Sequence, residues 1–438
     1  MALRRVPLPT FRQEDADLTI RSRFQVRAFS VPHLTLLALI IGVAGGAMTA
    51  RQEIDGLIDA LALTDLVGKL WVDALTMTIV PLVFGLIVTG VAAAASSAKQ
   101  SRLAMGAVLW FAILLLGACL LAAAATTFIL HLHPVPAAAT ALHVGTPPPI
   151  FSTPGEWIRG FAPTNPIKAA ADTAMVPLVI FALLFALALV RIEQQLQTAF
   201  LLLFRALTET MLVIVRWILL LAPVGVFALA FGVGARVGLS AAGALAHYVV
   251  VAAAACLLAA ILAWISAAVA GRMSPFAFVR AVLPAQIVGL STQSSLASLP
   301  AMLAAAAPLQ VPAATAGIIL PLAVSLFRAA SAAANVAVAV YLAHLHGLSP
   351  NVGTLLLGAL VAVPVSLAAV GLPAQVSFFA TIGPVCLAMG VPIGLLPLLL
   401  SVETIPDIFR TFGNVTADLA VLRIAGRGAS DRFPQDGN

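Results

Sequence analysis

The sequence predicts an all-α polytopic membrane protein, and three observations support this prediction. Of the 438 residues, 62% are hydrophobic and only 9% are charged, which excludes an ordinary water-soluble globular domain. Apolar runs of about 20 residues or more recur along the chain, and each is long enough to cross a ~30 Å hydrocarbon layer as a helix. The runs are continuous and do not alternate in polarity, which excludes an outer-membrane barrel.

The positions of the basic residues predict the orientation in the membrane. Six arginines precede the first apolar run and three follow the last, while alternate connections carry few basic residues. This asymmetry predicts an inner-membrane protein with both termini cytoplasmic. It also explains the net charge of +6 without a nucleic-acid partner. Residues 1–30 carry charges of both signs, so we expect a cytoplasmic tail and no cleavable signal peptide.

Residues 31–270 are predicted to form the first six membrane-spanning helices. The apolar runs cover residues 31–50, 67–96, 103–130, 171–191, 200–234 and 241–270. A proline-rich stretch, 131–165, separates the third run from the fourth and is predicted to be an extracytoplasmic loop. The three cysteines lie inside apolar runs at no metal-ligand spacing, so no metal site, disulfide or cofactor is expected.

After residue 272 proline, glycine and serine interrupt the apolar runs. The interruptions at 291–300 and 371–373 leave arms of about 10–18 residues, which predicts two re-entrant hairpins. A long helix with a polar middle is expected after each hairpin, at 311–345 and 391–425. This order is typical of the inverted repeats of secondary transporters, which bind their solute between the hairpin tips. Proline kinks in ordinary spans are the alternative.

The last predicted helix carries a polar stripe. Asp407, Thr411, Asn414 and Asp418 are spaced to share one face, and Arg410 lies at its edge. Ionisable groups inside a membrane must face protein or water, and a guanidinium can bind a carboxylate with two hydrogen bonds. The stripe therefore predicts a site for a small anionic solute. A purely structural Asp–Arg pair is the alternative.

These residues resemble a known family. The motif Asp407-x-x-Arg410-Thr411-x-x-Asn414-Val415-x-x-Asp418, the serine-rich tip 291–300 and the tip Gly371-Leu-Pro373 are similar to segments of the glutamate transporter family, the dicarboxylate/amino acid:cation symporters. The resemblance implies eight transmembrane helices, two re-entrant hairpins in inverted repeats, a homotrimer and an elevator motion. Helices 1, 2, 4 and 5 would form the scaffold, and helices 3 and 6 would join the transport part. Residues 271–425 would form the substrate-binding core, followed by a cytoplasmic tail, 426–438.

The resemblance also implies roles for single residues. Arg410 would bind the side-chain carboxylate of the substrate, and Asp407 would bind its amino group. Thr411 and Asn414 would hold the α-amino-acid end, and Ser295 would hold the α-carboxylate. Asp418 would belong to the ion-binding region. The remaining substrate-binding candidates are Ser294, Ser331, Leu372 and Pro373.

The seventh helix departs from the family pattern. Phe327 and Ala329 stand where sodium-coupled relatives have oxygen ligands, and Ala369 replaces a usual threonine. Sodium needs several oxygens around it, so these changes argue against sodium coupling. Arg328 adds a permanent positive charge, which we expect to pair with Asp418 as a tethered substitute for a bound cation. Two alternatives are that Arg328 hydrogen-bonds backbone carbonyls or contacts a substrate carboxylate.

Without sodium, uptake must be coupled to protons or to exchange. Glu403, Asp407 and Asp418 are the candidate proton carriers, with His247 a weaker one, and Asn335 stands where proton-carrying relatives have a glutamate. The sequence thus predicts a sodium-independent secondary transporter of an acidic amino acid or related carboxylate. A sodium-coupled symporter and an anion channel are the alternatives. An enzyme is not expected, because no catalytic pairing occurs at motif spacing.

Overall fold

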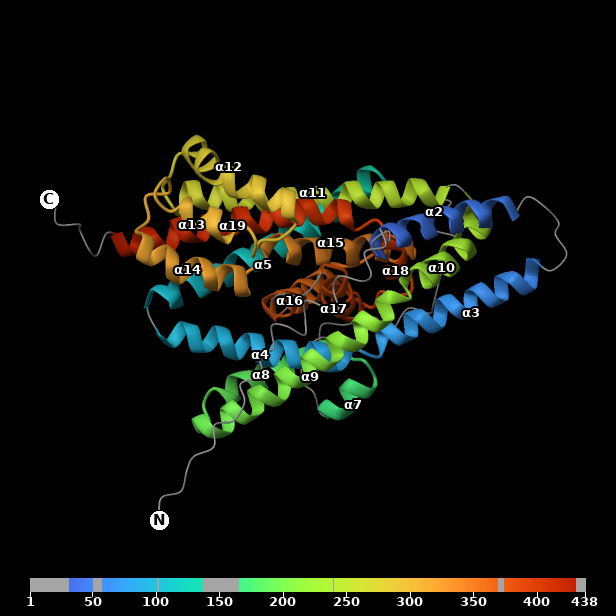
Figure 1. Ribbon diagram of the computed structural model, residues 1–438, viewed down its shortest axis with the longest axis horizontal. Coiled ribbons are helices and arrows are strands. Elements are labelled where there is room, and N and C mark those ends of the chain that lie inside the picture. The colour runs from blue at the N-terminus through green and yellow to red at the C-terminus, as the bar shows by residue number, and fades with distance from the viewer. Residues whose placement is uncertain are drawn as a thin grey trace, which may run out of the picture.

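Helices are the regular elements throughout the part of the chain that the structure describes. The computed structural model describes residues 31–49, 57–100, 102–136, 165–238, 240–368 and 374–430. Figure 1 shows an elongated bundle in which most long helices follow the longest axis. Among the described residues, six helical stretches are long and apolar enough to cross a membrane, and five shorter apolar helices accompany them. These findings agree with the predicted all-α polytopic membrane class.

The first half of the chain forms nine helices within the described ranges. They are α2 (Val31–Thr49), α3 (Leu57–Thr76), α4 (Ile79–Gln100), α5 (Arg102–Leu132), α7 (Pro166–Ala171), α8 (Met175–Leu189), α9 (Gln194–Leu220), α10 (Ala222–Val237) and α11 (Ser240–Val269). Two predicted runs are divided, one at Met77–Thr78 and the other at Leu221. Pro81 and Pro223 follow these breaks. Proline has no N–H to bond the preceding turn, so it fits the first turn of a new helix.

Within the described ranges, the second half of the chain forms eight helices. They are α12 (Pro275–Thr292), α13 (Leu299–Ala304), α14 (Ala313–Leu326), α15 (Ala329–Leu345), α16 (Val352–Ala368), α17 (Ala374–Ala388), α18 (Leu396–Leu400) and α19 (Thr404–Ser430). Helices α12 and α13 flank the first predicted tip, and α16 packs against α17 on either side of the second. The second arm of the first hairpin is shorter than expected, because α13 gives way to turns before Gln310.

The two long helices expected after the hairpins are both interrupted. The helix predicted at 311–345 breaks at Phe327 and Arg328, whose backbones are non-helical. The helix predicted at 391–425 begins only at Thr404 and extends to Ser430. Gly390, with a φ of 70°, and Pro392 precede it and favour turns. The first break places backbone groups and side chains of the seventh helix at the cavity described below.

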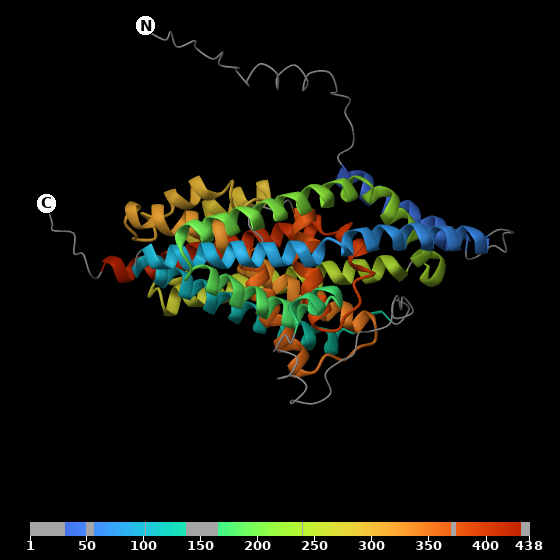
Figure 2. The ribbon, with the colours of Figure 1, turned by 90° about the horizontal axis from the view of Figure 1, so that it is seen from below.

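The helices pack in two groups that meet mainly at α4, which also contacts α5, α16 and α17. Helix α10 packs against α2 and α3, and α4 packs against α8 and α9. Helices α5 and α11 instead pack against α15 and α19. Seen from below in Figure 2, the blue α3 and α4 and the green α8 and α9 lie in front of the orange and red C-terminal helices. The third and sixth spans therefore adjoin the C-terminal helices.

Helix α15 lies at the centre of the second group. All its residues except Ser331 and His344 are buried, and it packs against α5, α11, α16 and α19. Its many alanines allow neighbouring backbones to come close. A Cβ atom added at Gly413 of α19 would lie 2.5 Å from the Cβ of Ala330. This close approach brings the polar stripe of α19 onto the beginning of α15.

Candidate functional site

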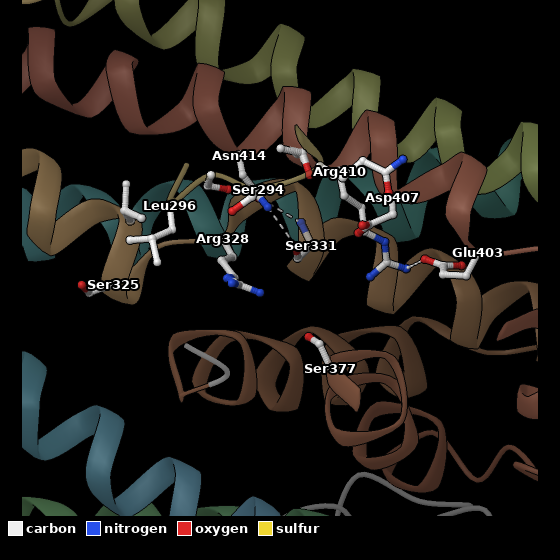
Figure 3. Close-up of a pocket in the computed structure, with 14 residues that line it drawn as sticks. Ser294, Leu296, Ser325, Arg328, Ser331, Ser377, Glu403, Asp407, Arg410 and Asn414 are labelled. Carbon is white, nitrogen blue, oxygen red and sulfur yellow. Dashed lines mark hydrogen bonds and ion pairs between the residues drawn. The ribbon is translucent and has the colours of Figure 1, made fainter. Parts of the chain in front are cut away.

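A cavity of about 190 Å³ lies where the first hairpin tip, the α14–α15 break, α17 and α19 meet (Figure 3). This volume exceeds the ~15 Å³ that a water molecule requires and is below the ~300 Å³ of the smallest drug-sized sites. The cavity therefore suits a small solute. Nine of the twelve predicted site residues line it: Ser294, Ser295, Arg328, Ser331, Glu403, Asp407, Arg410, Thr411 and Asn414.

The tip of the first hairpin is held by its own hydrogen bonds. Helix α12 ends at Gln293, whose backbone is left-handed with a φ of 50°. The Ser294 hydroxyl accepts the N–H of Ala297 at 3.2 Å, and the Ser298 hydroxyl donates to the Ser294 carbonyl at 2.9 Å. These bonds give the tip a fixed shape, with Ser294 and Ser295 at the cavity wall.

Asn414 joins α19 to the first turn of α15. Its Oδ1 accepts the backbone N–H groups of Ala330 at 3.0 Å and Ser331 at 3.2 Å. Its Nδ2 donates to the Ser331 hydroxyl at 2.9 Å. Asn414 therefore satisfies donors that the break leaves without helical partners. The sequence predicted that Asn414 holds solute, but the structure shows an oxygen already engaged in positioning α15.

Arg410 is buried and ion-paired. Its Nη2 atom lies 2.6 Å from Oε1 of Glu403, the residue that immediately precedes α19. The other Glu403 oxygen accepts the Tyr248 hydroxyl at 2.5 Å, and Arg410 NH1 donates to Oδ1 of Asn335 at 3.3 Å. A neighbouring carboxylate and an amide thus hold the guanidinium at the edge of the cavity. The dashed line between Arg410 and Glu403 in Figure 3 marks the ion pair.

Two members of this network, Tyr248 and Asn335, were not among the predicted site residues. Tyr248 is one of only two tyrosines in the chain and stands in an alanine-rich helix. Asn335 is a polar residue surrounded by alanine and valine, and its Oδ1 also accepts the Thr381 hydroxyl of α17 at 3.3 Å. The sequence feature that could have identified these two residues is a single polar side chain in an apolar span. Their partners lie far away in the sequence.

The expected pair between Arg328 and Asp418 is not formed. The salt bridges found among the described residues do not include it, and neither oxygen of the fully buried Asp418 accepts a hydrogen bond from them. Arg328 immediately precedes α15, and its guanidinium instead lines the cavity. Asp407, on the cavity wall, and Asp418 are the negative charges that act most strongly on Arg328. The pairing fails because Asp418 lies on α19 beyond the cavity lining, whereas the Arg328 side chain extends into the cavity.

Phe327 and Ala329 fill space at the break and provide no side-chain oxygen. Phe327 is buried, and its ring stacks on Phe111 of α5 with centroids 4.7 Å apart. Ala329 is buried as well. Within the described ranges, no group of three histidine, cysteine, aspartate or glutamate side chains could hold a metal ion. An aromatic pair therefore occupies the interface between the third span and the seventh helix.

The second hairpin contributes Ser377 of α17 to the cavity wall. Its predicted tip, with Ala369, Leu372 and Pro373, lies outside the described residues. The predicted contribution of Leu372 and Pro373 to substrate binding therefore remains a prediction.

Comparison with known proteins identifies relatives along nearly the whole chain. The model of the sodium:dicarboxylate symporter family matches residues 32–427. The chain is 25% identical to the proton/glutamate-aspartate symporter of Escherichia coli (strain K12) over 91% of its own length and 92% of that protein. It is 27% identical to C4-dicarboxylate transport protein 1 of Pseudomonas paraeruginosa (strain DSM 24068 / PA7), over 89% and 87%. It is also 25% identical to the proton/sodium-glutamate symport protein of Bacillus subtilis (strain 168), over 80% and 83%.

Proposed function

Because the chain belongs to the sodium:dicarboxylate symporter family, we propose that it carries a small carboxylate, an acidic amino acid or a dicarboxylate, across the bacterial inner membrane without sodium. The family and the relatives above are transporters and not enzymes. The observation that carries the proposal is Arg410, a guanidinium at the wall of a small cavity with serine, threonine and asparagine side chains around it. Such a group selects for carboxylate.

Sodium independence is supported by the α14–α15 break. A sodium ion needs several oxygen ligands to replace its water shell. The stacked rings of Phe327 and Phe111 occupy this region, and Ala329 has no oxygen in its side chain. Arg328 places a fixed positive charge near Asp407 and Asp418, where a mobile cation would be repelled. The side chains of Phe327 and Ala329 therefore provide no ligand for a sodium ion, and the charge of Arg328 opposes its binding here.

Proton coupling is supported by the position of Glu403. Its carboxylate is ion-paired with the Arg410 guanidinium that would bind the substrate. The Glu403 carboxylate and the substrate carboxylate therefore compete for Arg410. Protonation of Glu403 would remove the competing charge and release Arg410 for the substrate. Tyr248 and Asp407 are the other titratable groups that act on this carboxylate. Substrate binding should accordingly tighten as the pH falls.

We also propose the domain arrangement that the sequence predicts. The eight-span topology with two re-entrant hairpins, the elevator motion and the homotrimer are what the resemblance to the family implies. The packing of α5 and α11 against α15 and α19 supports a transport part that includes the third and sixth spans. Alternating access through such a part distinguishes a carrier from an anion channel, which would need a continuous polar lining.

Uptake by the purified protein in liposomes tests the proposal. Labelled succinate, L-aspartate and L-glutamate are offered while sodium, proton and potassium gradients are imposed one at a time. We expect saturable uptake of at least one of them that a proton gradient drives and that is equal in sodium and choline buffers. Uptake that rises steeply with sodium would refute sodium independence. Uptake only against internal carboxylate would replace proton coupling by exchange.

A further inference from the structure

Arg328 makes no direct contact with a carboxylate of the described residues, although the charges of Asp407 and Asp418 act on it. It forms neither a hydrogen bond nor an ion pair with any side chain in the described ranges. Figure 3 shows its guanidinium extending into the cavity, on the same side as that of Arg410 and toward Ser377 of α17. The cavity is therefore bordered by two guanidinium groups, and only that of Arg410 is paired with a carboxylate.

Arg328 lies at a position in the backbone where a positive charge without an ion-pair partner is unfavourable. It is the N-cap residue of α15, a helix of 17 residues. The N-terminus of a helix carries a partial positive charge that stabilises anions and destabilises cations. An arginine at this end, inside a membrane protein, is unfavourable unless an anion accompanies it. The cavity beside it provides room for that anion.

The remaining charges limit what kind of anion fits. Asp407, also on the cavity wall, is acted on by two cations, Arg410 and Arg328, so its single negative charge does not offset both of them. An ammonium group placed beside Asp407 would also be repelled by Arg328. With Arg410 at one end and Arg328 at the other, the positive charges suit a solute with a carboxylate at each end and no charge between them.

We infer that Arg328 binds the second carboxylate of the substrate and makes this protein selective for small dicarboxylates without an amino group. The inference rests on the proposed function, since it assumes that Arg410 binds the first carboxylate. It replaces the expected pairing of Arg328 with Asp418. Arg328 is then a specificity-determining residue, and the substrate carboxylate accepts the hydrogen bonds that its guanidinium donates to no described side chain.

Calorimetric binding to the purified full-length protein tests this inference. The ligands are succinate, L-aspartate and butyrate, which resembles succinate but has one carboxylate. The variants are Arg328→Gln, Arg328→Lys and, as a matched control, Arg216→Gln, which removes an exposed arginine from α9. We expect the unmodified protein to bind succinate about tenfold or more tighter than L-aspartate. Loss of one charge-assisted contact corresponds to roughly 10- to 100-fold, so Arg328→Gln should weaken succinate binding by that factor.

The comparison of ligands separates a direct contact from a structural effect. Butyrate lacks the second carboxylate, so its affinity should change less than about threefold in Arg328→Gln. A structural effect would instead weaken the binding of both ligands equally. Arg328→Lys, which retains the charge, should recover part of the succinate affinity. Equal losses for succinate and butyrate, or a preference for L-aspartate in the unmodified protein, would overturn the inference and leave the proposed function intact. If no carboxylate binds the unmodified protein, both fail.

Discussion

Replacing Arg410 by alanine should affect stability and transport separately, because this residue has a partner inside the protein. The guanidinium lies 2.6 Å from the buried Glu403 carboxylate, whose other oxygen accepts only the Tyr248 hydroxyl. Removing one member of a buried ion pair leaves the other charge uncompensated and costs about 3–5 kcal/mol. Arg410→Ala alone should therefore lower the temperature at which the purified protein loses its assembled state.

A second substitution separates this structural cost from the loss of the substrate contact. In the double variant Glu403→Gln with Arg410→Ala, both charges of this ion pair are removed together, and the glutamine can still accept the Tyr248 hydroxyl. Most of the thermal stability should return. Carboxylate binding should remain weakened by about 2–5 kcal/mol, the usual cost of truncating one partner of a buried charge pair. This corresponds to roughly 30- to several-thousand-fold in Kd.

The assay combines two measurements on the same preparations. Size-exclusion chromatography after stepwise heating reports assembly, and uptake into liposomes at equal protein content reports transport. Arg216→Ala, which removes an exposed arginine from α9, is the control. If the double variant takes up succinate, aspartate and glutamate as fast as the unmodified protein, Arg410 does not bind substrate, and the site assignment is wrong.

Two further predictions concern coupling and assembly. In Glu403→Gln, the carboxylate that competes with the substrate for Arg410 is absent at every pH, so substrate binding should become nearly independent of pH between 5 and 8. The unmodified protein should bind substrate more tightly at the lower end of this range. Calorimetry measures this pH dependence, with Tyr248→Phe as a second variant that removes the hydroxyl bonded to Glu403. If Glu403→Gln leaves the pH dependence unchanged, the proton coupled to substrate binding is held by another group. Native mass measurement in a mild detergent should give three chains per particle, as family membership implies, and a monomer would count against the scaffold proposed for residues 31–270.

The class of the protein was determined by the sequence alone, for a physical reason. A bilayer requires long apolar segments whose backbone bonds are satisfied internally, so composition and run length suffice to predict a helical membrane protein. Asp407, Arg410 and Asn414 share a helix face at a fixed spacing, and for that reason the candidate site on α19 was also predictable. All the α19 candidates except Asp418 line the cavity.

The pairing of these side chains was decided by the tertiary structure. Glu403 and Tyr248 are 155 positions apart in the sequence and form a 2.5 Å hydrogen bond, which no local pattern indicates. The sequence paired Arg328 with Asp418 by charge alone, but the break after Phe327 directs Arg328 into the cavity. Attraction between charges depends on distance and surroundings. Both are set only when α11, α15 and α19 pack around the cavity.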